Sequence, residues 1–157
     1  MGKRVLIPLP TEDFDPTECA VPWLALRRQG IQIDFATPRG QTARCDMRML
    51  NGTGLGILAP ILAADQNGRE AYAKLKQAAE FKSPLSWTDI HDANYDGVML
   101  PGGHAPGMKP YLESKLLHNF VTECFNRGFT VKDRSYLSAS WPGDAHRFAY
   151  ELIAMLG

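Results

Sequence analysis

The chain has 157 residues, of which 45% are hydrophobic and 22% are charged, and these values predict one soluble globular domain spanning residues 1–157. Its 17 basic and 17 acidic residues cancel, so the total charge gives no reason to expect binding to nucleic acid or to an anionic membrane surface. No apolar run is long enough to span a bilayer, and the apolar run after Lys3 and Arg4 stops at Pro8 instead of continuing as a signal peptide.

The three cysteines, Cys19, Cys45 and Cys124, are odd in number and widely spaced. This usage is typical of reduced thiols in a cytoplasmic protein and not of a disulfide framework. The chain has no Cys-x-x-Cys spacing, and its four histidines do not follow a metal-binding pattern. We therefore expect a cytoplasmic protein that holds no metal and no cofactor.

The hydrophobic patterns predict an alternation of strands and helices. In chain order they predict a strand at residues 5–7, a helix at 16–28, a strand at 31–36, a helical turn within the loop-rich stretch 38–66, a helix at 68–79, a turn region at 84–92, a strand at 97–101, a helix at 112–127, strands at 129–133 and 136–140, and a helix at 144–156. This order predicts an α/β fold of the flavodoxin-like kind, a three-layer sandwich with a mostly parallel sheet.

The first helix has clear start signals. Asp15 is suited to the N-cap, and Glu18 stands where a capping box places its carboxylate. Pro22 lies inside the predicted helix and should kink it. In open parallel sheets, ligands bind beyond the carboxyl ends of the strands, so we expect residues 10–18, 101–106 and 140–144 to meet at one site.

Three stretches of the sequence resemble one protein family. They are FDPTECAVPW at residues 14–23, NYDGVMLPGGHAPGMKPYLES at residues 94–114 and FTVKDRSYLSASWPGDAHRF at residues 129–148. These motifs resemble the ThiJ/PfpI superfamily, the type 1 glutamine amidotransferase-like proteins. In that family a strand and a sharp turn carrying the nucleophilic cysteine, followed by a helix, lie between the second and third stretches. Here Gly128 is followed directly by Phe129, and no cysteine in the chain is followed immediately by a histidine.

The resemblance implies roles for four residues. It implies that Glu18 is the proton partner of the family nucleophile, and that Gly102, Gly103 and the amide of His104 form an oxyanion hole. The nucleophile itself is absent from the expected place. Simpler interpretations stand beside these roles, since Glu18 also completes a capping box and two glycines after a strand also make a tight turn.

The missing segment leaves a position in the interior of the sheet. Residues 129–133 alternate between apolar and polar side chains, which fits an edge strand, whereas residues 136–140 carry no charge and fit a central parallel strand. We expect residues 136–140 to lie beside the strand at 97–101.

Three hypotheses about function follow. The first is a family member without the catalytic cysteine, inactive as an enzyme, whose residual pocket binds a small molecule or a partner. The second is an active glyoxalase, deglycase, amidotransferase-like or peptidase-like enzyme whose thiol comes from Cys19 or from a partner subunit. The third is a natural or engineered deletion variant without an independent function.

An assembly is predicted as well. Removing an interior strand and its covering helix exposes apolar surface and an unpaired sheet edge, so we expect a homodimer or larger oligomer. Residues 129–157 are candidates for exchange between two subunits.

Overall fold

The computed structural model describes residues 2–124 and 145–156. Its main sheet has the strand order β5-β3-β1-β6, with β1 at Arg4–Pro8, β3 at Gln32–Thr37, β5 at Leu85–Ser86 and β6 at Gly97–Val98. Each neighbouring pair in this sheet is parallel. The predicted α/β fold of the flavodoxin-like kind, with a mostly parallel sheet, is confirmed.

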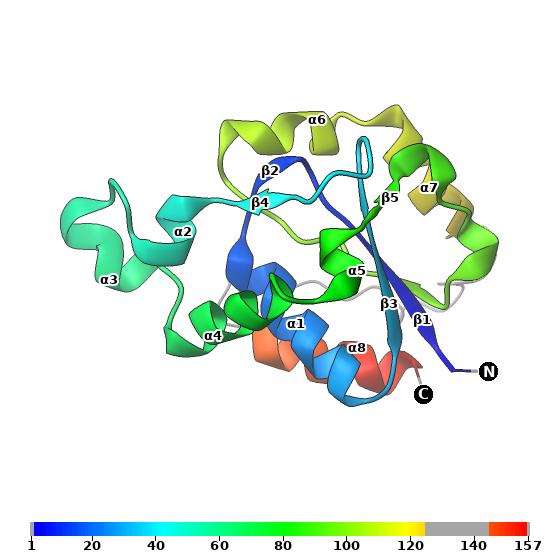
Figure 1. Cartoon of the computed structure of the whole chain (residues 1–157), viewed down its shortest axis with the longest axis horizontal. Helices are drawn as coiled ribbons and strands as arrows, with labels where there is room; N and C mark the ends of the chain where they lie inside the picture. The colour runs from blue at the N-terminus through cyan, green and yellow to red at the C-terminus, as the bar shows by residue number, and fades with distance from the viewer. Residues whose placement is uncertain (1, 125–144, 157) are drawn as a thin grey trace.

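The helices cover both faces of this sheet. Figure 1 shows α1, α4 and α8 on one side of β1 and β3 and α7 on the other, while α6 lies at the top of the view, above β2. The α-helices are α1 (Pro16–Arg28), α2 (Met47–Asn51), α3 (Ala59–Leu62), α4 (Gln66–Leu75), α5 (Ala79–Lys82), α6 (Lys109–Leu112), α7 (Lys115–Cys124) and α8 (Ala145–Leu156). Short 3-10 helices lie at η1 (Gly56–Leu58), η2 (Trp87–Asp89), η3 (Asp92–Asn94) and η4 (Pro106–Met108).

The core lies between α1 and the sheet. The side chains of Val5, Leu6 and Ile7 in β1 are fully buried, as a central parallel strand requires. Beyond β3, the rings of Phe35 and Phe81 meet edge to face with their centroids 5.3 Å apart. Helix α1 continues through Pro22 to Arg28, so the predicted bounds of this helix are correct.

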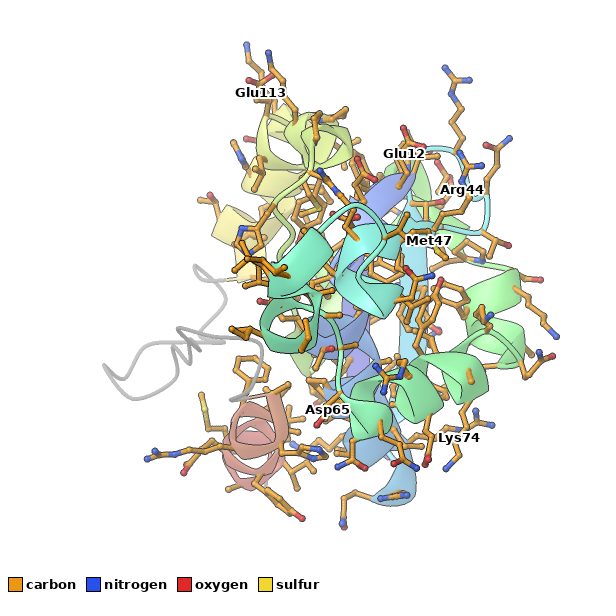
Figure 2. All side chains as sticks on the ribbon, turned by 90° about the vertical axis from the view of Figure 1, so that its left-hand side faces the viewer. Glu12, Arg44, Met47, Asp65, Lys74 and Glu113 are labelled. Carbon is orange, nitrogen blue, oxygen red and sulfur yellow. The ribbon has the colours of Figure 1, made fainter. Side chains whose placement is uncertain are left out.

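A second, two-stranded parallel sheet was not predicted. It pairs β2 (Glu12–Phe14) with β4 (Arg44–Cys45), and each strand is too short to show a hydrophobic period. Figure 2 shows Glu12 and Arg44 facing one another beside this pair, where the Arg44 Nη2 atom lies 3.0 Å from the Glu12 Oε2 atom. The strand β2 follows the carboxyl end of β1 after residues 9–11.

Two predicted helices have different bounds in the structure. The helix expected at residues 68–79 is α4, which begins earlier because the Asp65 side chain caps it through the amide of Gly68, and which ends at Leu75. The helix expected at residues 112–127 is divided into α6 and α7. The Ser114 hydroxyl accepts a hydrogen bond from the amide of Leu117, so a new helix start interrupts the run.

The buried face of α7 carries Leu117, Phe120 and Cys124, whereas Leu116 is 38% exposed. The strand predicted at residues 97–101 is shorter in the structure, although the amide of Met99 still donates to the carbonyl of Leu6. The closing helix predicted at residues 144–156 is confirmed as α8, which packs against α1.

Several predictions fall on residues 125–144, outside the described part of the chain. They are the strands at 129–133 and 136–140, the position of 136–140 beside β6, and the contribution of residues 140–144 to the site. The loss of the family strand and helix therefore stays a prediction.

Two glycines with the same backbone φ, Gly52 and Gly54, allow a test of the side-chain packing between α2 and α4. Gly52 and Gly54 both have a φ of +78°, but a Cβ on Gly52 would lie 2.6 Å from the Cβ of Ala59, whereas a Cβ on Gly54 would meet no atom within 4 Å. We expect Gly54→Ala to lower the free energy of unfolding by about 1 kcal/mol through backbone strain alone, and Gly52→Ala by about 2 kcal/mol. Urea unfolding of both variants measures the difference, and equal losses would contradict the packing described here.

Candidate functional site

The start of α1 is joined to the turn after β6 by two hydrogen bonds to one glycine. The Asp15 amide donates to the carbonyl of Gly102 over 2.8 Å, and the Gly102 amide donates to the Glu18 Oε2 atom, also over 2.8 Å. Glu18 therefore lies beside the glycine turn, as expected. The reciprocal capping box is wrong, because the Asp15 amide bonds Gly102 and not Glu18.

Asp15 caps α1 by itself. Its Oδ1 atom accepts hydrogen bonds from the amides of Thr17 and Glu18, over 2.8 and 3.0 Å. The residue is 1% exposed. Burial raises the pKa of the Asp15 carboxyl and the nearby Glu18 carboxylate adds to this, while the two amide hydrogen bonds oppose it. The buried Asp15 carboxyl thus fixes the backbone at Glu18, whose side chain binds the Gly102 amide.

The glycine turn offers backbone donors at the same place. Gly102 uses its amide to bind Glu18, so it is not a free donor. The amides of Gly103 and His104 donate to no residue in the described part of the chain. Of the three amides expected to form an oxyanion hole, two have no partner among the described residues. The third, that of Gly102, binds the Glu18 carboxylate, which was expected to serve the nucleophile.

Asp13 in β2 binds the segment that follows this turn, and no sequence pattern predicted this contact. Its backbone has a φ of +73°, which only a few non-glycine residues adopt, aspartate among them. Its Oδ2 atom accepts a hydrogen bond from the amide of Gly107 over 2.9 Å. Its carbonyl oxygen lies 2.5 Å from the position that a Cβ on Gly103 would take, so only glycine fits there.

Tyr111 on α6 is a second residue that the sequence did not suggest. Its ring packs against Trp87, with 6.3 Å between the centroids, and the residue is 7% exposed. Its hydroxyl is buried and forms no hydrogen bond in the structure. Burial raises the pKa of the Tyr111 hydroxyl, and the charges of Cys19 and Glu18 act in the same direction.

The three cysteines of the chain, Cys19, Cys45 and Cys124, are all buried. Complete burial raises the pKa of the Cys19 thiol well above its ordinary value, and the nearby Asp15 carboxylate adds to the effect. Burial also raises the pKa of Cys45, against a hydrogen bond with Tyr72 that lowers it. A thiol is nucleophilic as the thiolate, which these surroundings disfavour.

Within residues 2–124 and 145–156, no three histidine, cysteine, aspartate or glutamate side chains cluster in a way that could hold a metal ion. In the same residues, no helix combines the length and the apolar character needed to cross a membrane.

Comparison with known proteins extends this description. A profile of the ThiJ/PfpI family-like group matches residues 9–140. An uncharacterized protein of Schizosaccharomyces pombe is 28% identical over 122 residues, which cover 76% of this chain. The chain spans 44% of the length of that relative.

Solved structures share the fold. The Rapid Encystment Protein 24 KDa of Francisella tularensis superimposes with a TM-score of 0.68 at 14% identity, covering 99% of each chain. A ThiJ/PfpI domain protein of Brachyspira murdochii gives 0.63 at 10% identity, over 99% of this chain and 98% of that chain. DJ-1beta of Drosophila melanogaster gives 0.58 at 16% identity, over 99% of this chain and 91% of that chain. With the profile match over most of its length, the chain belongs to the ThiJ/PfpI-like family.

Proposed function

We propose that this protein is a ThiJ/PfpI-like family member that has lost the family's catalytic cysteine and acts by binding a small molecule at the junction of Glu18 and Gly102. The observation that supports the proposal is the hydrogen bond that the Glu18 carboxylate accepts from the Gly102 amide. Each of the chain's three thiols, meanwhile, is buried. A general acid or base needs a reacting group within hydrogen-bond reach, and the Glu18 Oε2 atom is 2.8 Å from the Gly102 amide nitrogen.

The second hypothesis, an enzyme that uses Cys19, has less support. Cys19 follows Glu18 on α1 but is fully buried, and both Asp15 and Glu18 raise the pKa of its thiol. Thiolate formation at Cys19 would place a charge in an apolar interior beside two carboxyl groups. A binding role needs no such charge.

Turnover assays test the proposal. We expect no consumption of methylglyoxal or glutamine above the rate without protein, because no described thiol is poised at the Gly102 turn. The matched control is Cys19→Ser, which should give the same background rate as the wild-type protein. Turnover by the wild-type protein that is lost in Cys19→Ser would overturn the proposal in favour of the second hypothesis.

We also propose that the chain self-associates. In the described part of the sheet, β6 pairs with β1 on one side, and Leu100, two residues after the end of β6, is 50% exposed. Apolar side chains beside a sheet edge favour association with another chain. Sedimentation at micromolar concentration should show a dimer or larger oligomer, and a stable monomer would contradict this.

Exchange of residues 129–157 between subunits is a finer prediction. It is tested by whether a crosslink between α8 and α1 joins two positions of one chain or joins two chains.

A further inference from the structure

The chain contains two Asn-Gly pairs, Asn51-Gly52 and Asn67-Gly68, and both asparagines are exposed. In such a pair the backbone nitrogen of the glycine can attack the Cγ atom of the asparagine side chain. A five-membered imide ring forms, and the side-chain nitrogen leaves as ammonia. Water then opens the imide to give aspartate or isoaspartate. Glycine favours this reaction because it has no Cβ to hinder the attack and its backbone rotates freely.

Asn51 is the last residue of α2, and its side chain folds back over the peptide that would react. Its Oδ1 atom accepts hydrogen bonds from the amide of Thr53, over 3.1 Å, and from the Thr53 hydroxyl. Because Gly52 lies between these two residues, the bonds hold the Asn51 carboxamide against the Gly52 peptide. They also draw electrons from the Cγ carbonyl, which makes Cγ a better electrophile. One bond opposes the attack, from the Gly52 amide to the carbonyl of Arg48 over 2.9 Å.

The segment around Asn51 has little packing to keep that bond closed. None of the residues in α2, η1 and α3 is buried. Figure 1 shows α2 and α3 projecting to the left, away from the main sheet. Segments with few buried apolar contacts open locally at a low cost in free energy. Since Asn51 ends its helix, the attack requires the loss of the Gly52 cap bond and leaves the rest of α2 in place.

Asn67 stands in a different setting, at the start of α4. This ten-residue helix has four buried residues. The amide of Gly68 donates to the Asp65 Oδ1 atom over 2.7 Å, which caps the helix. A Cβ on Gly68 would lie 2.7 Å from the Oγ1 atom of Thr17, so the helix start packs closely against α1. The attack at Asn67 therefore requires the first turn of α4 to unwind and to separate from α1.

We propose that Asn51 is a site of spontaneous deamidation in the folded protein, and that the fold protects Asn67. This inference is independent of the proposed function. The conversion adds one negative charge to a chain whose formal net charge is +0 at pH 7. The new carboxylate would stand at the C-terminus of α2, where the helix macrodipole disfavours a negative charge. Arg48 is the one charged residue within 47–62 and is paired with Asp46. The product should therefore be less ordered than the parent around α2.

Peptide mapping of aged protein tests the assignment. Native protein and protein unfolded in urea are incubated at about pH 8, and mass spectrometry follows the conversion of Asn51 and of Asn67 separately. In urea the two should react at similar rates, because their chemistry is the same. In the native protein Asn51 should react at least about tenfold faster than Asn67, since a difference of about 1.4 kcal/mol in the free energy of opening gives that ratio. Equal rates, a faster reaction at Asn67, or no reaction at Asn51 in the native protein would overturn the proposal.

Two matched variants give an independent readout. Glutamine has one more methylene group than asparagine and would have to close a less favourable six-membered ring. The acidic isoform that isoelectric focusing resolves in aged protein should therefore disappear in Asn51→Gln and persist in Asn67→Gln. Persistence in Asn51→Gln would overturn the proposal. Hydrogen exchange tests the opening itself, since the amide of Leu55, bonded to the carbonyl of Gly52, should exchange faster than that of Arg69, bonded to the carbonyl of Asp65. Slower exchange at Leu55 would contradict the proposed cause of the difference.

Discussion

Gly103→Ala should destabilise the protein by about 3 kcal/mol, the upper part of the usual range for overpacking. A Cβ at this position would lie 2.5 Å from the carbonyl oxygen of Asp13 and 2.8 Å from the Cγ and Sδ atoms of Met108. The carbonyl belongs to a backbone already held at a φ of +73°, and the Asp13 side chain is tied to the amide of Gly107. The clash can therefore be relieved only by moving β2 away from the turn.

Gly102→Ala is the matched control for this prediction. Its Cβ would lie 2.7 Å from the Glu18 Oε2 atom, which is the end of a flexible side chain. We expect a loss of about 1 kcal/mol, the usual contribution of one hydrogen bond, because Glu18 can swing aside. Urea unfolding of both variants measures the two losses. If Gly103→Ala costs no more than Gly102→Ala, the close approach of Asp13 to the turn is wrong.

Asp15→Ala should lower the free energy of unfolding by about 2 kcal/mol, whereas Asp15→Asn should leave the protein at least as stable as the wild type at pH 7. Alanine removes the acceptor for the amides of Thr17 and Glu18, which is the loss of an N-cap. Asparagine keeps an acceptor oxygen and carries no charge in a position that is 1% exposed.

The pH dependence of this comparison follows from the pKa of Asp15, which burial raises above the ordinary value of 3.8. A carboxyl with a raised pKa binds its proton more tightly in the folded state, so its contribution to stability is greatest at low pH and falls as pH rises through the folded-state pKa. The advantage of Asp15→Asn should therefore increase from about pH 4 upward. Unfolding curves at several pH values measure it, and an advantage that grows toward acid pH would contradict the buried carboxyl.

The sequence predicted β1, β3, α1 and α8 well because these elements carry strong local signals. The strand β5 lies in a stretch predicted as a turn region, and β6 is shorter than predicted. The apolar run at residues 5–7 and the Asp15 cap each specify structure within a few residues. The division between α6 and α7 was missed because one serine hydroxyl starts a new helix inside an amphipathic run. The β2–β4 pair was missed because strands of three and two residues have no readable period.

The site was predictable only in part. The family resemblance indicated Glu18 and Gly102, and the structure brings them within hydrogen-bond distance. The competing capping box could not be rejected from sequence, since it depends on where the Asp15 amide points. Asp13 and Tyr111 had no local signal. Asp13 has an unusual backbone conformation and Tyr111 has a buried hydroxyl, and both features become visible only when the surroundings of these residues are known.

The absence of a reactive thiol is the central claim, and the alkylation rate of each cysteine tests it most directly. Iodoacetamide is added at pH 7.5 to native protein and to protein unfolded in urea, and mass spectrometry follows Cys19, Cys45 and Cys124 separately. Because all three side chains are buried, and burial raises the pKa values of Cys19 and Cys45, each should react at least about 100-fold more slowly in the native protein. A cysteine that reacts faster in the native protein than in urea would contradict the account, because it would be an activated nucleophile.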